Sequence, residues 1–185
     1  MTVSLVERLT GADVAQLTTL DASFTTDAVL RIDQDGDGFS FREEDVSPPV
    51  TKTYGLAGHL RPGAPPPWDQ LFVVRRGAVI VAVAATTYVG WNGRQRLDEL
   101  HVVPAHRGAG LARGLVDRVL AEAVRNGARE LWLETQHVNL PAIRAYQRLG
   151  FRITGVDVCR YRPPHDGEAA VFLSRDVVAG RSAVG

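Results

Sequence analysis

DELHVVPAHRGAGLARGLVDRVLAEA, residues Asp98–Ala123, is the stretch around which the rest of this chain is arranged. It passes from an apolar strand through a glycine-rich turn, Arg107–Ala112, into an amphipathic helix. Two glycines and two alanines give the turn almost no side-chain volume, so an outside group can approach its backbone closely. The helix presents its first N–H groups and the positive end of its dipole to the same space. The turn is therefore predicted to bind an anion, and a phosphate suits it best.

Hydrophobic periodicity predicts an α/β arrangement for the remaining chain. We expect a helix opening at Thr10, a second from Gly110 to the stop at Gly127, and a third over 141–149. Residues 46–68, rich in proline and glycine, are expected to form an irregular surface connection. Strands are expected over 3–9, 71–74, 78–88, 97–103, 131–135, 151–158 and 169–173.

The segment Asp33–Glu44, DQDGDGFSFREE, matches the spacing of a calcium-binding EF-hand loop. An EF-hand needs a helix on each side, but Pro48 and Pro49 follow too soon for a full exiting helix. The flanking residues alternate as strands do, so we predict a hairpin turned by Asp-Gly-Asp-Gly and no calcium site.

Composition restricts the class of protein. The chain has 185 residues, 45% of them hydrophobic, and a formal net charge of zero, which fits one globular domain over 1–176 with a loose tail over 177–185. Neutrality argues against a nucleic-acid partner. We find no signal peptide and no apolar run long enough to cross a membrane, and the single cysteine, Cys159, cannot form an internal disulfide. These features lead us to expect a cytoplasmic protein.

The turn has a recognisable spacing. Arg107, Gly110 and Ala112 resemble the Arg/Gln-x-x-Gly-x-Gly/Ala signature of the GNAT N-acetyltransferase superfamily, and Val102-Val103-Pro104 resembles the end of the preceding GNAT strand. The resemblance implies a mixed sheet of six to seven strands flanked by helices, here with an added N-terminal hairpin. It also implies that acetyl-coenzyme A is bound by Val102, Val103, Arg107, Gly108, Ala109, Gly110, Leu111, Ala112 and Asn139.

A narrower resemblance covers roughly Asp98–Tyr161. The string Leu133–Gln136, with Asn139, Ala142, Tyr146, Gly150, Phe151 and Val156-Asp157, is similar to streptothricin acetyltransferases, which acetylate the β-lysyl amine of an antibiotic. Where those enzymes tend to carry Asp and Ala, this chain has Glu99 and His101. That departure bears on the acceptor rather than on acetyl transfer.

The resemblance also assigns roles to Asn139 and Tyr146, which follow the strand expected over 131–135. The resemblance implies that Tyr146 protonates the departing thiolate as a general acid. The alternative for Tyr146 is a buried aromatic packed beside Ala142 and Leu149. Asn139 is expected to bond the pantetheine arm, or else to cap the following helix.

The general base is sought on the strand that leads into the turn. Alternation places Glu99 and His101 on one face and Asp98 on the other, unless a bulge shifts the register. Glu99 is the candidate base, with a surface ion pair to arginine as its alternative. Asp98, His101 and Trp91 are candidate acceptor-binding residues, although Trp91 would serve equally well as edge packing.

The sequence therefore predicts an acetyl-coenzyme A-dependent N-acetyltransferase that works by direct attack of a primary amine, without a covalent enzyme intermediate. The acceptor is expected to be a small cationic or aminoglycoside-like antibiotic. Two alternatives stay open at this point: a protein or peptide N-acetyltransferase, and a non-catalytic coenzyme A sensor. No metal, nucleic acid or membrane partner is expected, and the chain should be a monomer or a homodimer.

Overall fold

The structure, a computed structural model, describes residues 2–5, 10–163, 165 and 167–177. The predicted tail from residue 178 onward, and residues 6–9 of the first predicted strand, lie outside the described residues. The helices are α1 (Gly11–Thr18), the short 3-10 helix η1 (Pro104–His106), α2 (Leu111–Arg125) and α3 (Leu140–Arg148). The strands are β1 (Val3–Leu5), β2 (Phe24–Asp35), β3 (Gly38–Lys52), β4 (Gln70–Arg76), β5 (Val79–Val89), β6 (Arg94–Val102), β7 (Glu130–Gln136), β8 (Arg152–Asp157) and β9 (Ala170–Asp176).

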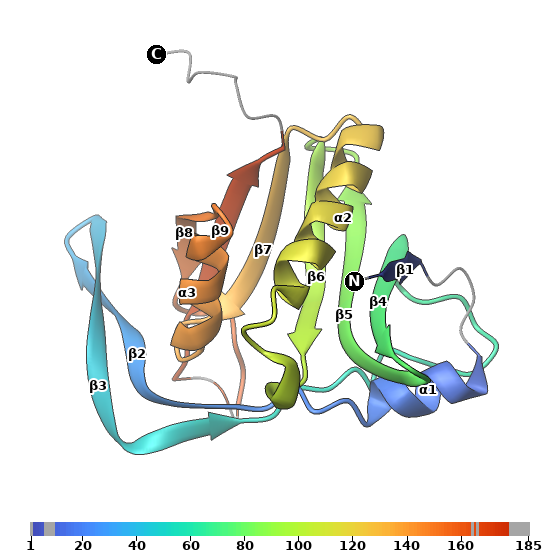
Figure 1. Cartoon of the computed structure of the whole chain (residues 1–185). Coiled ribbons are helices and arrows are strands. Elements are labelled where there is room, and N and C mark those ends of the chain that lie inside the picture. The colour runs from blue at the N-terminus through green and yellow to red at the C-terminus, as the bar shows by residue number, and fades with distance from the viewer. Residues whose placement is uncertain (1, 6–9, 164, 166, 178–185) are drawn as a thin grey trace. The chain divides into compact units, whose positions relative to one another are not determined.

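Seven strands form one mixed sheet in the order β1-β4-β5-β6-β7-β9-β8, and β2 pairs only with β3 (Figure 1). This confirms the predicted sheet of six to seven strands and the added hairpin. The chain divides into two compact units: Met1–Ser23, Thr53–Trp132 and Asp176–Gly185 in the first, Phe24–Lys52 and Leu133–Arg175 in the second. The single domain over 1–176 stays a prediction.

In the first unit, α2 packs on one face of β4, β5 and β6 (Figure 1). Its predicted apolar side is buried through Leu111, Leu115 and Val119. The guanidinium of Arg118, on α2, lies 5.5 Å from the centre of the Phe72 ring, so Phe72 of β4 faces α2. Because neighbouring residues of a strand point to opposite faces, Leu71 and Val73 face the other side. There they join Val14 and Leu17 of α1, with Val83 and Ala85 of β5, in one buried cluster.

Local chemistry fixes the ends of the helices where the sequence predicts them. The Thr10 hydroxyl accepts from the Asp13 N–H at 3.1 Å, and the Asp13 carboxylate accepts from the Thr10 N–H, which makes a reciprocal capping box. Pro141 lies in the first turn of α3. Gly127 and Gly150 follow α2 and α3 with positive φ angles, the conformation that glycine adopts most readily after a helix.

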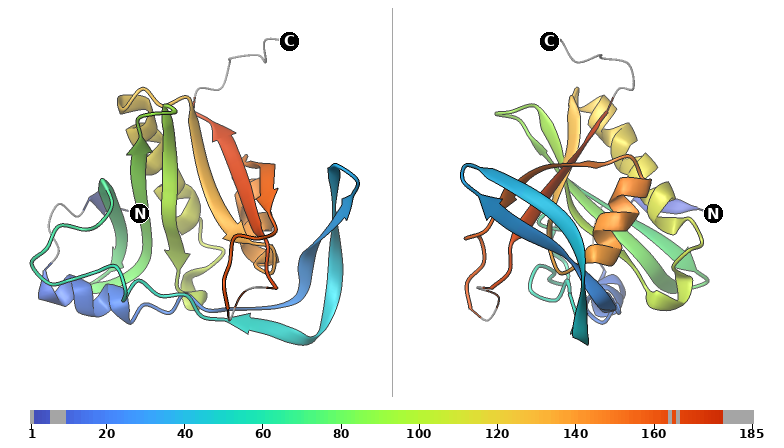
Figure 2. Two further views of the ribbon diagram at one scale, coloured as in Figure 1. Left: turned by 180° about the vertical axis from the view of Figure 1, so that it is seen from behind. Right: turned by 90° about the vertical axis from the view of Figure 1, so that its left-hand side faces the viewer.

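In the second unit, β2 and β3 form a long, twisted two-stranded hairpin (Figure 2). Asp35 pairs with Gly38, so Gly36 and Asp37 form a two-residue turn, and Gly36 has φ of 56°. The predicted Asp-Gly-Asp-Gly hairpin is therefore confirmed.

One boundary prediction is wrong. Residues 46–52, expected to begin the irregular connection, belong to β3. Asp45 pairs with Ala28 and Val50 pairs with Thr26, so residues 46–49 all lie opposite one position of β2. Pro48 and Pro49 fall in this interruption of the ladder, where the missing N–H of a proline costs no strand hydrogen bond. The irregular connection begins only at Thr53.

The hairpin distributes the residues of the EF-hand pattern over two strands. The Asp33 carboxylate forms ion pairs with Nε of Arg31 at 3.2 Å and Nε of Arg42 at 3.0 Å, and the Glu44 carboxylate pairs with Arg42 at 2.7 Å. Calcium, which requires six to eight oxygen ligands around one point, would have to displace these arginines. We therefore expect millimolar calcium to shift neither the melting temperature nor the tryptophan emission. A saturable shift that Glu44→Gln abolishes would restore the EF-hand interpretation.

The second unit also contains α3 and the antiparallel pair β8–β9. The β2 strand is held there by the Leu30 N–H, which donates to the His137 carbonyl at 3.0 Å, and α3 is tied to β3 by Arg144 Nε, which donates to Glu43 at 3.0 Å. Among the described residues, no helix is long and apolar enough to cross a membrane.

Candidate acetyl-transfer site

The turn before α2 presents a run of backbone donors. Gly108 and Gly110 both have φ of 77°, and Gly110 occupies the cap position of α2 without any side-chain cap. The first hydrogen bond of the helix is donated by the Gly114 N–H to the Gly110 carbonyl at 3.1 Å. Within the described residues, the six N–H groups from Gly108 to Arg113 have no acceptor. Six unpaired donors at the positive end of a helix form an anion-binding nest.

The space in front of this nest is open. A methyl group built on Gly108 or Gly110 would meet nothing within 4 Å. The glycines are therefore required by their backbone angles rather than by crowding, because side chains rarely adopt a φ of +77°. The nest fits the pyrophosphate of acetyl-coenzyme A in charge, donor number and access.

Arg107 fixes the position of the turn. Its Nε donates to the Val102 carbonyl at 3.0 Å, and its Nη2 donates to the Ser23 carbonyl at 2.6 Å. The guanidinium thus ties the end of β6 and the segment after α1 to the nest, and it adds positive charge beside it. Ser23 was missed by the sequence analysis, since nothing local marks a carbonyl 84 positions away as a partner.

The backbone at the end of β6 is partly paired. The Val103 N–H donates to the Val81 carbonyl at 3.1 Å, and the binding of acetyl-coenzyme A by Val102 and Val103 stays a prediction. The parallel ladder between β6 and β7 pairs Arg94–Arg96 with Glu130–Trp132.

A bulge brings the acidic residues of β6 to one face. Ala85 pairs with Glu99 and Thr86 pairs with Leu97, which leaves Asp98 as an extra residue. Glu99 and His101 share a face as predicted, and His101 Nε2 lies 2.7 Å from Glu99 Oε2. Their cross-strand partners, Ala85 and Val83, belong to the cluster beneath α1, so this face is opposite to α2.

The predicted placement of Asp98 on the other face is wrong. Its carboxylate accepts from the Thr87 hydroxyl at 2.7 Å and pairs with Arg96. Thr87 and Arg96 are opposite each other on the face that carries Ala85 and Glu99. The bulge is the cause, because one extra residue turns its side chain to the same side as the next. Burial raises the pKa of Asp98, against the hydrogen bonds from Thr87 and Arg96.

Trp91 is not brought to this group. Trp91 is 87% exposed and lies in the turn that precedes the first residue of β6. Glu99 and His101 lie near the other end of that strand. Its role as an acceptor-binding residue stays a prediction. The structure gives no cross-strand or side-chain support for it.

Asn139 and Tyr146 belong to the second unit and are described within it. Asn139 caps α3 through Oδ1, which accepts from the Ala142 N–H at 3.3 Å, so the capping alternative is confirmed. Tyr146 is half-buried on α3, and its ring meets the Phe151 ring edge-on at 5.8 Å and 65°. Packing and a catalytic hydroxyl are compatible in such a position, because only the ring is used in packing.

The described residues contain no group of three or more His, Cys, Asp or Glu side chains arranged to hold a metal ion. A nest of backbone N–H groups between the end of a strand and the start of a helix is an arrangement that binds phosphate groups in other proteins. The chain belongs to the acetyltransferase (GNAT) family, whose model matches residues 37–151. It is an acetyl-coenzyme A-dependent N-acetyltransferase by family.

Two similar proteins match nearly the whole chain. The streptothricin acetyltransferase of Streptomyces lavendulae is 36% identical over 168 residues, which cover 88% of this chain and 89% of that protein. The crystal structure of nourseothricin acetyltransferase superposes with a TM-score of 0.83 at 34% identity, covering 96% of this chain and all of that one. A Bacillus anthracis protein, solved in complex with acetyl coenzyme A, shares the fold with a TM-score of 0.75 at 22% identity over 95% of this chain and 99% of that one.

Proposed function

We propose that this protein acetylates a primary amine of a streptothricin-type antibiotic, using acetyl-coenzyme A as the acetyl donor. The observation that carries the proposal is similarity along the full length of an antibiotic acetyltransferase, since the chain covers 89% of the Streptomyces lavendulae protein at 36% identity. The free nest at Gly108–Arg113 and the carboxylates of β6 supply the donor and acceptor chemistry that such a reaction needs.

Binding of the donor is assigned to the nest. The N–H groups of Gly108 to Arg113 would hold the pyrophosphate, and Arg107 would keep the turn in place through the carbonyls of Val102 and Ser23. The amide nitrogen of Asn139 would donate to the pantetheine arm while its oxygen caps α3. Bound acetyl-coenzyme A supplies an activated thioester, so the protein itself needs no nucleophile.

Glu99 is the proposed base. A primary amine is mostly protonated near neutral pH and must lose a proton before it attacks a carbonyl. Glu99 would take that proton, directly or through a water molecule, and His101 at 2.7 Å would orient the carboxylate or pass the proton on. Asp98, fixed by Thr87 and Arg96 on the same face, is the proposed acceptor-binding carboxylate.

The transfer is then a single addition and elimination. The amine nitrogen forms a bond to the thioester carbon, the carbon–sulfur bond breaks, and the thiolate takes a proton from Tyr146, which regains one from solvent. The products are the acetylated amine and free coenzyme A. Cys159, the one cysteine, is exposed after β8 and takes no part. We place this reaction in the cytoplasm.

The proposal is tested by following thiol release with acetyl-coenzyme A and three kinds of acceptor: a streptothricin, simple primary amines, and peptides with free amino termini. We expect release with the streptothricin alone, and mass spectrometry should show one added acetyl group. Glu99→Gln should slow turnover roughly tenfold, less than a sole base would, because His101 remains beside it. Release with peptides only would favour a protein acetyltransferase. Binding of coenzyme A without release for any acceptor would favour a sensor domain.

A further inference from the structure

The connection formed by residues 53–69, which leads into β4, is irregular but firmly anchored in the first unit. Leu56 and Leu60 are 1% and 6% exposed and belong to the buried cluster beneath α1. The His59 N–H donates to the Leu56 carbonyl at 3.0 Å, which closes a turn between the two leucines. Long ordered segments without regular secondary structure commonly have a function of their own.

The cluster that Leu56 and Leu60 join lies beside the candidate base. It includes Ala85 of β5, which is paired with Glu99 of β6. Trp68, at the other end of the connection, also packs against this cluster. Trp68 therefore lies on the face of the sheet that carries Glu99, opposite to α2.

Two hydrogen bonds place Trp68 at the acidic end of that face. The carboxylate of Asp69, the next residue, accepts from the Tyr88 N–H at 2.7 Å. Thr87 precedes Tyr88, and its hydroxyl donates to the Asp98 carboxylate at 2.7 Å. Trp68 and Asp98 are thus both held near the same end of β5.

The backbone and the neighbouring rings hold Trp68 in place before any ligand binds. The prolines at positions 65–67 precede it, and their fixed φ angles leave this part of the chain few alternative conformations. The His59 ring lies 6.0 Å from the Trp68 ring at an angle of 53°. Trp68 is only half-buried, so part of its surface is accessible. An aromatic side chain fixed in this way binds a ligand with little loss of conformational entropy.

The charges around Trp68 favour a cation. Three carboxylates belong to this part of the face, together with one guanidinium and one imidazole: Asp69, Asp98, Glu99, Arg96 and His101. A negative potential attracts cationic ligands. The face of a tryptophan ring is the best aromatic partner for a cation.

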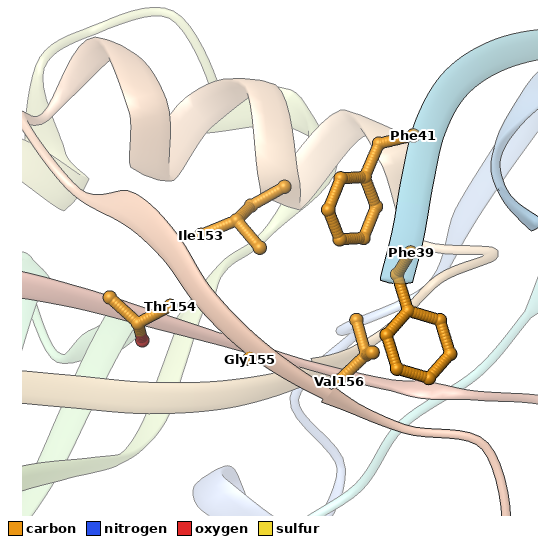
Figure 3. A pocket seen from close by; sticks show the side chains of 6 residues that line it. All are labelled: Phe39, Phe41, Ile153, Thr154, Gly155 and Val156. Carbon is orange, nitrogen blue, oxygen red and sulfur yellow. The ribbon is translucent and has the colours of Figure 1, made fainter. Parts of the chain in front are cut away.

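A groove of about 460 Å³ in the second unit lacks such groups (Figure 3). Phe39 and Phe41 of β3 form one wall, and residues 153–156 of β8 form the other. No charged side chain is among these lining residues, and the Thr154 hydroxyl already lies 3.2 Å from Ser174 Oγ. A cationic group buried there would have no opposite charge, so the face that carries Trp68 suits a cation better.

We propose that Trp68 is a specificity-determining residue, whose indole ring binds a cationic group of the acceptor beside the Asp98 carboxylate. This inference rests on the proposed function, because that function supplies the cationic acceptor. The ring acts in binding and takes no part in the chemical step. Its loss should therefore raise the KM for the acceptor and leave kcat and the affinity for acetyl-coenzyme A nearly unchanged.

Steady-state kinetics of Trp68→Leu with streptothricin and acetyl-coenzyme A test the proposal. Leucine keeps an apolar contact with the cluster but has no ring face, so the KM for streptothricin should rise roughly tenfold. Trp68→Phe keeps a weaker aromatic face and should raise that KM only about threefold. Titration with streptothricin should change the tryptophan emission of the wild type, and this change should be lost in Trp68→Phe.

Tyr88→Leu is the matched control. It removes a ring of similar burial from the position next to Thr87, where the side chain points to the opposite face of β5. Its kinetic constants should equal those of the wild type. The melting temperature of each variant shows whether the cluster beneath α1 is intact.

The outcomes separate this inference from the proposed function. If the wild type acetylates streptothricin and Trp68→Leu has the same KM, the inference is wrong and the proposed function stands. An equal rise in the KM for acetyl-coenzyme A would make Trp68 a structural residue. If calorimetry shows that the wild type binds streptothricin without thiol release, and that Trp68→Leu binds it more weakly, the proposed function fails and the inference holds. A wild type that neither binds nor acetylates streptothricin overturns both.

Discussion

Gly110→Asp should lower the affinity for acetyl-coenzyme A by at least about 100-fold while the protein stays folded. The carboxylate would stand at the cap of α2, within the run of N–H groups assigned to the pyrophosphate. Two like charges about 4 Å apart repel by about 4 kcal/mol at an effective dielectric constant near 20. The aspartate would also attract the N–H groups that the phosphate needs. Both effects act against the same ligand.

Folding should survive the substitution. The added side chain meets nothing within 4 Å, so the cost comes from the φ of 77° alone. A left-handed backbone costs an ordinary residue about 1–2 kcal/mol, and aspartate tolerates it better than most. This is small beside the usual stability of a domain, about 5–15 kcal/mol. The melting temperature should therefore fall by a few degrees only.

Two controls separate charge from strain. Gly110→Asn has the same shape and backbone cost without the charge, and it should weaken binding far less than Gly110→Asp. Gly77→Asp places the same charge at another open glycine, with φ of 59°, and should leave binding unchanged. Isothermal titration with acetyl-coenzyme A gives the affinities. An unchanged affinity in folded Gly110→Asp would remove the nest from the pyrophosphate site.

The sequence was sufficient for the features that neighbouring residues determine. The capping box of Thr10 and Asp13, the turn at Gly36 and the nest at Gly108–Arg113 depend on residues within a few positions of one another. Glycine adopts a positive φ at little cost in free energy, and the hydroxyl of an N-cap residue easily reaches the backbone N–H three residues further on. Such features can be read before any tertiary contact is known.

Features that depend on a neighbouring strand could not be predicted. Whether Asp98 shares a face with Glu99 depends on one extra residue in the β6 ladder, which its pairing with β5 decides. Whether the Val103 N–H is free depends on the position of the Val81 carbonyl. Proline usually ends a strand, because it has no N–H to donate to the ladder. At Pro48 and Pro49 the ladder between β2 and β3 is already interrupted, so the strand continues past them. In each case the deciding partner is distant in the sequence.

Tyr146→Phe should reduce turnover by roughly 10²-fold and leave the affinity for acetyl-coenzyme A unchanged. When the tetrahedral intermediate collapses, the departing thiolate is stabilised by a proton or a hydrogen bond, and the phenol is the proposed source. Coenzyme A is a fairly good leaving group, so the expected loss lies at the low end for general acid catalysis.

The structure makes this substitution conservative for packing. Tyr146 is half-buried, and its ring contact with Phe151 at 5.8 Å uses ring atoms that phenylalanine keeps. Removing one hydroxyl should change the free energy of unfolding by about 1 kcal/mol, the usual worth of a hydrogen bond. A fall in turnover therefore cannot be attributed to a lost core contact, provided that the melting temperature changes little.

A second tyrosine in the same unit provides the control. The Tyr161 hydroxyl donates to Glu134, so Tyr161→Phe also removes a bonded phenol, but from a residue without an assigned catalytic role. Turnover and acetyl-coenzyme A affinity should be measured on both variants with the acceptor that the thiol-release assay identifies. If Tyr146→Phe turns over as fast as the wild type, Tyr146 is a packing residue and the proton comes from water or another side chain. If both variants are equally slow, the loss of turnover comes from a general effect of removing a phenol from the second unit, and Tyr146 is not the general acid.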